Sequence, residues 1–294
     1  MAWQQLTFWL DEADAEAVQF WLENADALAI TYLDAEDSPR YEADAEHLNL
    51  WPRSRLQALF PEDRELGPLL ALLQLQFPQK TLRYECTRLE DQPWERVCMD
   101  QFQPQCFGGK LWICPSWHRL PIPDAIVVTL DPGLAFGTGT HPTTQLCLEW
   151  LAAADLHNKT VLDYGSGSGI LGIAAAALGA KEVWLTDNDP QALEASNQNA
   201  AKNHLTAPQL NCVLPEHLPP VSFDIVIANI LANPLIALAP QLLHYLKPGG
   251  KLILSGLLLD QVEKLHAAYR PAVLFSATQL REEWVRLEGQ RQVI

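Results

Sequence analysis

The feature that most restricts how this chain can fold is a glycine-rich turn in its second half. Gly165, Gly167 and Gly169 alternate directly after an apolar run that ends at Asp163. Because glycine has no Cβ, such residues permit a tight strand-to-helix turn and let a ligand approach the backbone closely. A tight turn without a ligand is the alternative, but three alternating glycines directly after a strand favour a ligand site.

Strand-like and helix-like segments alternate around this turn. Repeated strand-helix units with apolar strands predict an α/β fold with a doubly wound, mostly parallel sheet that is covered on both faces. The last two strands are separated by almost nothing, which fits a hairpin and predicts that the sheet finishes with an antiparallel strand. The expected elements are strands over 160–163, 182–186, 223–228, 251–256, 272–282 and 284–288, and helices over 145–153, 169–179, 190–203, 234–246 and 259–269.

The first 90 residues follow a different order of elements: strand, helix, strand, strand, helix, strand. This order is typical of a ferredoxin-like α+β domain. Its expected strands cover 3–10, 27–33, 48–51 and 81–89, and its helices cover 13–24 and 61–77. A chain of this length is expected to form roughly two domains. We expect an N-terminal substrate-recognition domain over 1–90 and a catalytic domain over 131–294, joined by a connector over 91–130. The connector is expected to hold a short helix over 93–101 and strands over 110–114 and 125–130.

The charge of the chain argues against nucleic acid as a direct partner. The formal net charge is −16 and the sequence pI is about 4.8, so the overall field repels phosphate backbones. Residues 1–60 carry twelve Asp or Glu against three Arg. This region would attract a basic partner, with a merely solvated acidic surface as the alternative.

Cysteines and apolar runs further limit the class of protein. The six cysteines form no C-x-x-C pair, which indicates reduced thiols and no metal site. No apolar run of membrane-spanning length occurs, and the first residues lack the pattern of a signal peptide. We expect a cytoplasmic protein, with no membrane association, that acts as a monomer.

The residues around the glycine turn favour one cofactor over another. Gly167–Gly172 also satisfies the G-x-G-x-x-G pattern of dinucleotide sites, and Asp187 suits a ribose diol in either case. Asp163, however, is a carboxylate placed just before the glycines, where it suits the cationic amino group of a methionine moiety and opposes a pyrophosphate. The turn itself supplies no Lys or Arg for phosphate. S-adenosyl-L-methionine is therefore favoured over NAD.

Two further segments should face the same crevice. Asn229 ends a strand of the predicted sheet, so its side-chain carbonyl can accept a hydrogen bond from a substrate N–H. The polar loop over 131–144 precedes the glycine turn by one helix, where Thr144 can offer a hydroxyl to the ligand and Phe136 can shield a sulfonium. His141 is a candidate general base, with a structural hydrogen-bonding role as the alternative.

Four motifs, in this order and spacing, resemble those of the bacterial ribosomal protein L-eleven methyltransferases, the PrmA family of class I methyltransferases. The resemblance implies methylation of lysine side chains and of the N-terminal α-amine of that ribosomal protein, commonly to the trimethyl state. It also implies cofactor positions at Thr144, Gly165, Asp187 and Asn229, while no catalytic residue is assigned. The motifs are Phe136–Thr144, Val161–Gly169, Asp187–Pro190 and Asn229–Leu235.

The residues alone are compatible with three other functions. One alternative is a methyltransferase that acts on a small molecule or on RNA. A second is a non-catalytic S-adenosylmethionine-binding factor in ribosome assembly, and a third is a dehydrogenase that uses the same glycine pattern.

Overall fold

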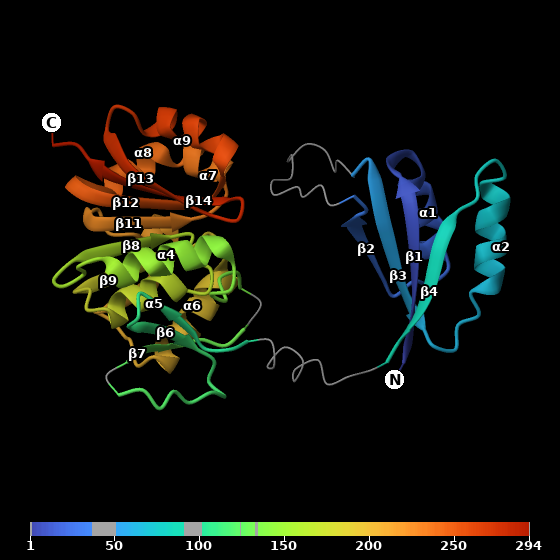
Figure 1. Ribbon diagram of the computed structural model, residues 1–294, viewed down its shortest axis with the longest axis horizontal. Helices are drawn as coiled ribbons and strands as arrows, with labels where there is room; N and C mark the ends of the chain where they lie inside the picture. The colour runs from blue at the N-terminus through green and yellow to red at the C-terminus, as the bar shows by residue number, and fades with distance from the viewer. Residues whose placement is uncertain (1, 37–50, 91–101, 124, 133–134, 294) are drawn as a thin grey trace. The chain divides into compact units, whose positions relative to one another are not determined.

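The structure is a computed structural model that describes residues 2–36, 51–90, 102–123, 125–132 and 135–293. The chain divides into two compact units, Met1–Val97 and Cys98–Ile294 (Figure 1). Each unit has a hydrophobic core of its own.

The first unit has the predicted ferredoxin-like topology. Its four strands are antiparallel neighbours in the order β2-β3-β1-β4. Leu6, Phe8 and Phe60 point from the sheet toward Val18 and Leu22 of the first helix, and all five are fully buried. The elements are β1 (Trp3–Asp11), α1 (Glu12–Asn24), β2 (Ala29–Asp34), β3 (Arg53–Pro61), α2 (Gly67–Gln76) and β4 (Arg83–Leu89).

The third strand and second helix of this unit lie elsewhere than the sequence predicts. The strand was expected over 48–51, of which 48–50 lie outside the described residues and Trp51 belongs to no strand. β3 instead covers Arg53–Pro61, where every second residue from Ser54 to Phe60 is buried. Pro61 pairs with Trp3 at the end of this strand, so the helix begins only at Gly67.

Part of the range predicted as a connector folds within the second unit. β5 (Gln105–Phe107), β6 (Leu111–Cys114) and β7 (Ile126–Thr129) form a three-stranded sheet. Its buried Leu111 and Val128 join the same core as Leu148. The helix expected over 93–101 lies outside the described residues.

The main sheet of the second unit has seven strands in the order β10-β9-β8-β11-β12-β14-β13. β14 pairs antiparallel with β12 and β13, and the other neighbours are parallel, which confirms the predicted doubly wound sheet with an antiparallel last strand. The strands are β8 (Thr160–Tyr164), β9 (Glu182–Thr186), β10 (Leu210–Val213), β11 (Phe223–Asn229), β12 (Leu246–Leu258), β13 (Val273–Arg281) and β14 (Trp284–Arg291).

Helices cover both faces of this sheet, and each face has its own core. One core joins Leu148 and Ile173 to Ile227 of the sheet. The other joins Leu242 and Leu265 to neighbouring strand residues on the opposite face. The helices of the first face are α4 (Pro142–Ala153), α5 (Ile170–Ala177) and α6 (Pro190–Lys202); those of the second are α7 (Ala232–Ala237), α8 (Ala239–Tyr245) and α9 (Val262–Tyr269), with short 3-10 turns at Pro215–His217 and Leu259–Gln261 (Figure 1).

Three features of this unit differ from the sequence prediction. β10 was not expected, because four residues carry too little periodicity to stand out. The helix predicted over 234–246 is two helices that meet at Leu238. Pro240 explains the break, since it has no N–H to donate and its ring clashes with the carbonyl four residues earlier. The helix expected from Gln145 begins three residues earlier, at Pro142.

Candidate functional site

The strand order reverses at β8, which has β9 on one side and β11 on the other. In open α/β sheets, ligands bind outside the carboxyl ends of the strands at such a reversal point. The glycine turn follows β8 at this end, Asp187 follows β9, and Asn229 is the last residue of β11. Three of the four predicted cofactor positions therefore lie on neighbouring strand ends.

The glycine turn is held in a conformation that side-chain-bearing residues rarely adopt. Gly165, Gly167 and Gly169 have φ angles of +74°, +53° and +80°. The N–H groups of Gly165 and Ser166 donate to the Thr186 carbonyl at 2.8 and 3.0 Å, which fastens the turn to the end of β9. A Cβ on Gly167 would lie 2.5 Å from the Phe136 carbonyl oxygen, so only glycine fits there.

The Asp187 carboxylate is oriented by two backbone donors. Its Oδ2 accepts a hydrogen bond from the Gly167 N–H at 2.9 Å, and its Oδ1 accepts one from the Asp189 N–H at 3.0 Å. Each carboxylate oxygen can accept more than one hydrogen bond. Asp187 is half-buried, so it can still accept hydrogen bonds from a diol.

Asp163 is buried beside the turn with half of its carboxylate unsatisfied. Its Oδ2 accepts the Gly172 N–H at 2.8 Å, whereas its Oδ1 has no hydrogen-bond partner among the described residues. Burial raises the pKa of Asp163 to about 7; the Gly172 hydrogen bond opposes this and the charge of Asp187 adds to it. A buried carboxylate in this state would gain from a cationic partner.

Thr144 and Asn229 meet across the end of the sheet. Thr144 is fully buried in the first turn of α4, and the Asn229 Nδ2 donates to its Oγ1 at 3.3 Å. The Asn229 Oδ1 is buried without a hydrogen-bond partner among the described residues. Asn229 is followed by Ile230, whose side chain occupies the space that a Cβ on Gly165 would need. The structure thus brings all four predicted cofactor residues into one neighbourhood.

His141 has a structural role in the described geometry. Its Nδ1 lies 2.7 Å from the Thr143 Oγ1 and caps the start of α4. Its ring packs edge-on against Phe136 and Trp284, with centroid distances of 5.5 and 5.0 Å. Burial lowers the pKa of His141, and the charges of two nearby glutamates oppose that shift.

Two residues that join this site escaped the sequence reasoning. Trp284 opens β14 opposite Leu258, so the antiparallel strand brings its ring to the carboxyl end of β12. Ser255 lies inside β12 and donates to the carbonyls of Val285 and Thr143, at 3.0 and 3.4 Å. The antiparallel order of the last strands was the only signal that could have pointed to Trp284.

The polar loop before α4 is attached to the glycine turn. The Ser168 N–H donates to the Phe136 carbonyl at 2.9 Å, and the Ser168 Oγ donates to the Gly137 carbonyl at 2.6 Å. These two hydrogen bonds hold the loop against the turn at Phe136 and Gly137.

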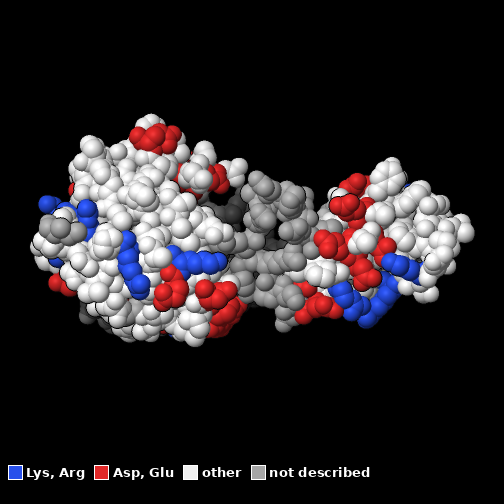
Figure 2. Space-filling model, turned by 90° about the horizontal axis from the view of Figure 1, so that it is seen from above, with Lys and Arg blue, Asp and Glu red and all other residues white. Residues whose placement is uncertain are grey.

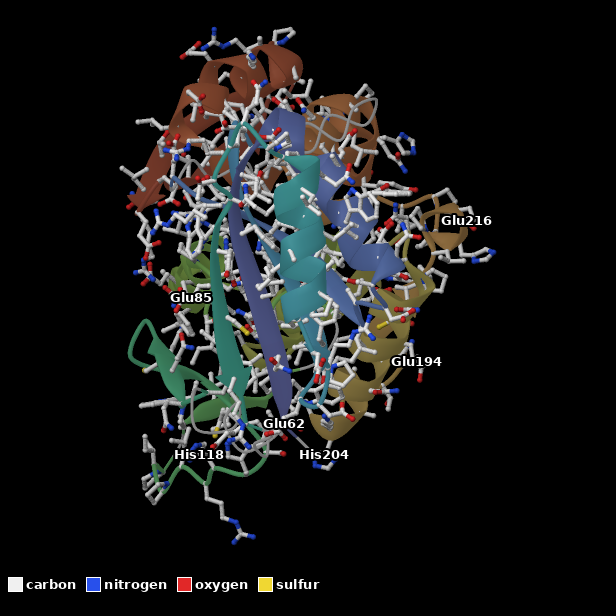
Figure 3. All side chains as sticks on the ribbon, turned by 90° about the vertical axis from the view of Figure 1, so that its right-hand side faces the viewer. Glu62, Glu85, His118, Glu194, His204 and Glu216 are labelled. Atoms are coloured by element: carbon white, nitrogen blue, oxygen red, sulfur yellow. The ribbon has the colours of Figure 1, made fainter. Side chains whose placement is uncertain are left out.

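No group of three or more metal-ligating side chains gathers anywhere in the described parts of the chain. Of the residues labelled in Figure 3, Glu194 and His204 come from α6 and the turn that ends it, whereas His118 follows β6 and Glu216 lies in the 3-10 turn Pro215–His217. None of the described helices is long and apolar enough to cross a membrane.

Known proteins of one family match nearly the whole chain. The family model for ribosomal protein L11 methyltransferase (PrmA) matches residues 2–292. The ribosomal protein L11 methyltransferase of Pseudomonas syringae pv. tomato is 48% identical over 292 residues, which cover 99% of this chain and 100% of that protein. That of Azotobacter vinelandii is 46% identical over the same coverage.

A solved structure gives the same result. The ribosomal protein L11 methylase from Lactobacillus delbrueckii subsp. bulgaricus superposes with a TM-score of 0.60 at 34% identity, covering 65% of this chain and all of that one. The chain belongs to the ribosomal protein L11 methyltransferase (PrmA) family of S-adenosylmethionine-dependent methyltransferases.

Proposed function

We propose that this protein methylates amino groups of ribosomal protein L11. The observation that carries the proposal is the pair of buried, unsatisfied oxygens, Asp163 Oδ1 and Asn229 Oδ1, at the carboxyl ends of adjacent strands. Buried polar atoms without partners are costly unless a ligand satisfies them. Amino groups, one from the cofactor and one from the substrate, are the donors that suit two such acceptors.

The residues around the turn fit S-adenosylmethionine. Asp163 would pair with its cationic amino group, Asp187 would accept hydrogen bonds from its ribose, and the backbone at Gly165 would lie against it. Thr144 would offer its hydroxyl to the amino-acid end. When bound, this cofactor supplies a methyl group on a positively charged sulfur.

The chain then has to hold an amine in line and uncharged. A lysine with its ordinary pKa near 10.4 is neutral in only about one molecule in a thousand at pH 7.4. Asn229 Oδ1 can orient an amine that has already lost its proton to water. Alignment of reactants in a dry pocket is what methyl transfer mainly demands, so no dedicated base is required.

The acceptors proposed are lysine side chains and the N-terminal α-amine, carried to the trimethyl state. Each transfer leaves an ammonium, which must lose a proton to water before the nitrogen can react again. The primary and monomethyl amines keep an N–H that can donate to the Asn229 carbonyl, whereas the dimethyl amine has none and must be held by the walls of the pocket. Repeated methylation therefore needs proton loss between transfers and room around the nitrogen.

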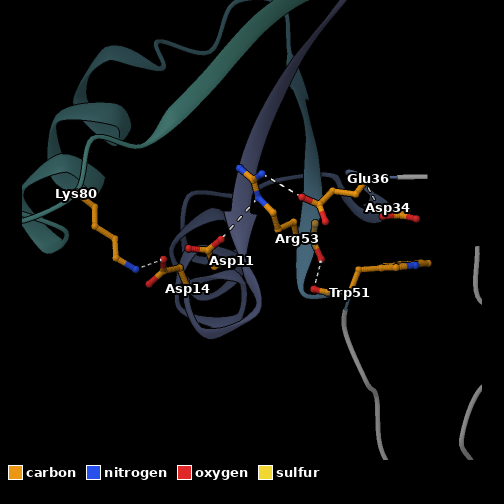
Figure 4. Close-up of polar contacts among 8 residues, drawn as sticks. Asp11, Asp14, Asp34, Glu36, Trp51, Arg53 and Lys80 are labelled. Carbon is orange, nitrogen blue, oxygen red and sulfur yellow. Dashed lines mark hydrogen bonds and ion pairs between the residues drawn. The ribbon is translucent and has the colours of Figure 1, made fainter. Parts of the chain in front are cut away.

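The first unit is proposed to recruit this basic substrate. Figure 2 shows Asp and Glu side chains gathered over that unit. Arg53 is paired with Glu36 and Asp11, at 3.1 and 3.9 Å, and Lys80 with Asp14 at 2.6 Å (Figure 4). Residues 1–60 hold twelve Asp or Glu against three Arg, so an excess of negative charge remains to attract a basic protein.

The substrate can be identified by an experiment that does not assume which molecule is methylated. An extract of cells that lack this gene is incubated with the purified protein and methyl-labelled S-adenosylmethionine, and the labelled species is identified by mass spectrometry. We expect the label in one small basic ribosomal protein. Label in RNA or in a small molecule would overturn the substrate assignment.

A further inference from the structure

The second unit contains a cavity that is separate from the crevice at the glycine turn. Its volume is about 840 Å³. It is lined by Lys159 just before β8, by Asp224 near the start of β11 and by the Lys247–Lys251 segment of β12. These are the amino ends of the parallel strands, whereas the glycine turn follows a carboxyl end. The C-terminal half of α4, including Trp150, forms another wall.

A buried arginine with two unsatisfied guanidinium nitrogens lines this cavity. Arg286 of β14 is only 7% exposed, and its Nε and Nη1 have no hydrogen-bond partner among the described residues. The nearest acidic atom, Glu288 Oε2, lies 3.8 Å from Nη1, which is too far for a hydrogen bond. Because a guanidinium stays charged, leaving its donors unsatisfied in a buried place is costly.

Glu288 accepts no hydrogen bond from Arg286 in this geometry, and other donors engage each of its two oxygens. Lys251 Nζ donates to Oε1 and Trp150 Nε1 donates to Oε2, each at 3.0 Å. Asp224, another acidic residue of the lining, pairs with Lys247 at 3.0 Å.

The remaining charges of the lining leave room for an anion. Glu149 is paired with Arg281 of the neighbouring strand at 2.6 Å. Asp155 and Lys159 are both exposed, and no ion pair joins them among the described residues. Among the charged side chains of the lining, Arg286 is the buried one whose Nε and Nη1 have no hydrogen-bonded partner among the described residues.

We propose that this cavity binds the oxyanion of a small organic molecule, a phosphate or a carboxylate, through Arg286. Arginine binds both groups well because its N–H donors match their oxygens. A volume of this size lies in the range of small-molecule sites, about 300–1,000 Å³. Trp150 provides an aromatic wall for the body of the ligand, and Lys159 adds a positive charge to the lining.

The test uses probes that lack adenosine, so that the cofactor crevice does not interfere. Phenyl phosphate, benzoate and inorganic phosphate are titrated into the full-length protein, by calorimetry, in the presence of saturating S-adenosylhomocysteine. We expect saturable binding of phenyl phosphate, of benzoate or of both, and the two probes distinguish the phosphate from the carboxylate source. Inorganic phosphate alone should bind more weakly, because it has no body to contact Trp150.

Variants then assign the site. Arg286→Gln should weaken binding by about tenfold or more, equal to about 1.4 kcal/mol. Lys159→Glu should weaken it severalfold, and because Lys159 is exposed this variant is expected to fold. Lys264→Ala, an exposed lysine on α9, is the matched control and should bind as the wild type does. If Arg286→Gln does not fold, the affinity of Lys159→Glu decides whether the proposal stands.

Two results would overturn the proposal. The first is the absence of saturable binding of both organic probes to the wild-type protein. The second is unchanged affinity in a folded Arg286→Gln variant or, where that variant does not fold, in Lys159→Glu. Neither result depends on methyl-transfer activity.

Discussion

Gly167 is a residue of the turn at which a side chain would collide with the backbone of the polar loop. A Cβ there would lie 2.5 Å from the Phe136 backbone oxygen, at a φ of +53°. We predict that Gly167→Ala displaces the polar loop, weakens S-adenosylmethionine binding by more than about tenfold and costs about 1–3 kcal/mol of stability. Calorimetric titration and thermal unfolding measure the two effects.

Gly179→Ala is the matched control for this substitution. Gly179 has a φ of +100°, but a Cβ there meets nothing within 4 Å. It should lower stability through backbone strain and leave cofactor affinity unchanged. Equal losses of affinity in both variants would contradict the role given to the turn.

Asp163 should make cofactor binding depend on pH. Its pKa is raised to about 7, first by burial and then by the charge of Asp187. Below pH 7 the carboxyl is neutral, so a cationic ligand must displace a proton, and affinity should fall by up to about tenfold per pH unit. The pKa of His141 is shifted below its ordinary value, so that group titrates at lower pH.

Calorimetry between pH 6 and pH 8, in buffers of different ionisation enthalpy, measures this proton release. Asp163→Asn should bind more weakly at pH 8 and show an almost flat pH profile. A variant profile that runs parallel to the wild type would rule out Asp163 as the titrating group.

At the scale of residues, the position of a side chain could be predicted from the sequence where it depends only on the strand that carries it. Asp163, Gly165, Asp187 and Asn229 each stand at or just after the end of a strand, and position in a doubly wound sheet follows from that. Trp284 and Ser255 could not be found in the same way. Their contacts with His141 and Thr143 at the start of α4 depend on the order in which distant strands pair.

At the scale of elements, strong periodicity was predictable and short or broken segments were not. The alternating buried residues of β3 lie between the strand expected over 48–51 and the helix expected over 61–77, where no element was predicted. β10 is four residues long, and α7 and α8 are separated only by the effect of Pro240. In each case tertiary packing decided between local patterns of similar strength.

The hairpin between β13 and β14 offers a prediction at this scale. Its two-residue turn consists of Glu282 and Glu283, and Glu282 has a φ of 55° while Glu283 does not have a positive φ. Glycine is favoured at the first central position of such a turn. We predict that Glu282→Gly stabilises the second unit by about 0.5–1 kcal/mol, measured as a rise in its unfolding midpoint.

Glu283→Gly is the control, because it adds backbone freedom without relieving a strained φ. It should lower the same midpoint. If the two substitutions have effects of the same sign and size, the strain assigned to Glu282 is wrong.

At the scale of the molecule, the two units should respond to core substitutions separately. Leu73 of α2 and Leu148 of α4 are both fully buried, in the separate cores of the first and second unit. Leu73→Ala and Leu148→Ala should each cost about 2–5 kcal/mol. Each should lower one of two transitions seen by calorimetry, and a single transition that shifts in both variants would contradict the two-unit description.

The central claim is that this site transfers methyl groups to amines of ribosomal protein L11. The most direct test is a single-turnover reaction of excess enzyme with S-adenosylmethionine and purified, unmodified L11, followed by intact-mass and peptide mass spectrometry. We predict that methyl groups appear on lysines and on the N-terminal amine, that Asn229→Ala slows the transfer by about a hundredfold, and that the exposed Asn197→Ala leaves it unchanged. An L11 mass that stays constant while the wild-type enzyme demonstrably binds S-adenosylmethionine would contradict the claim.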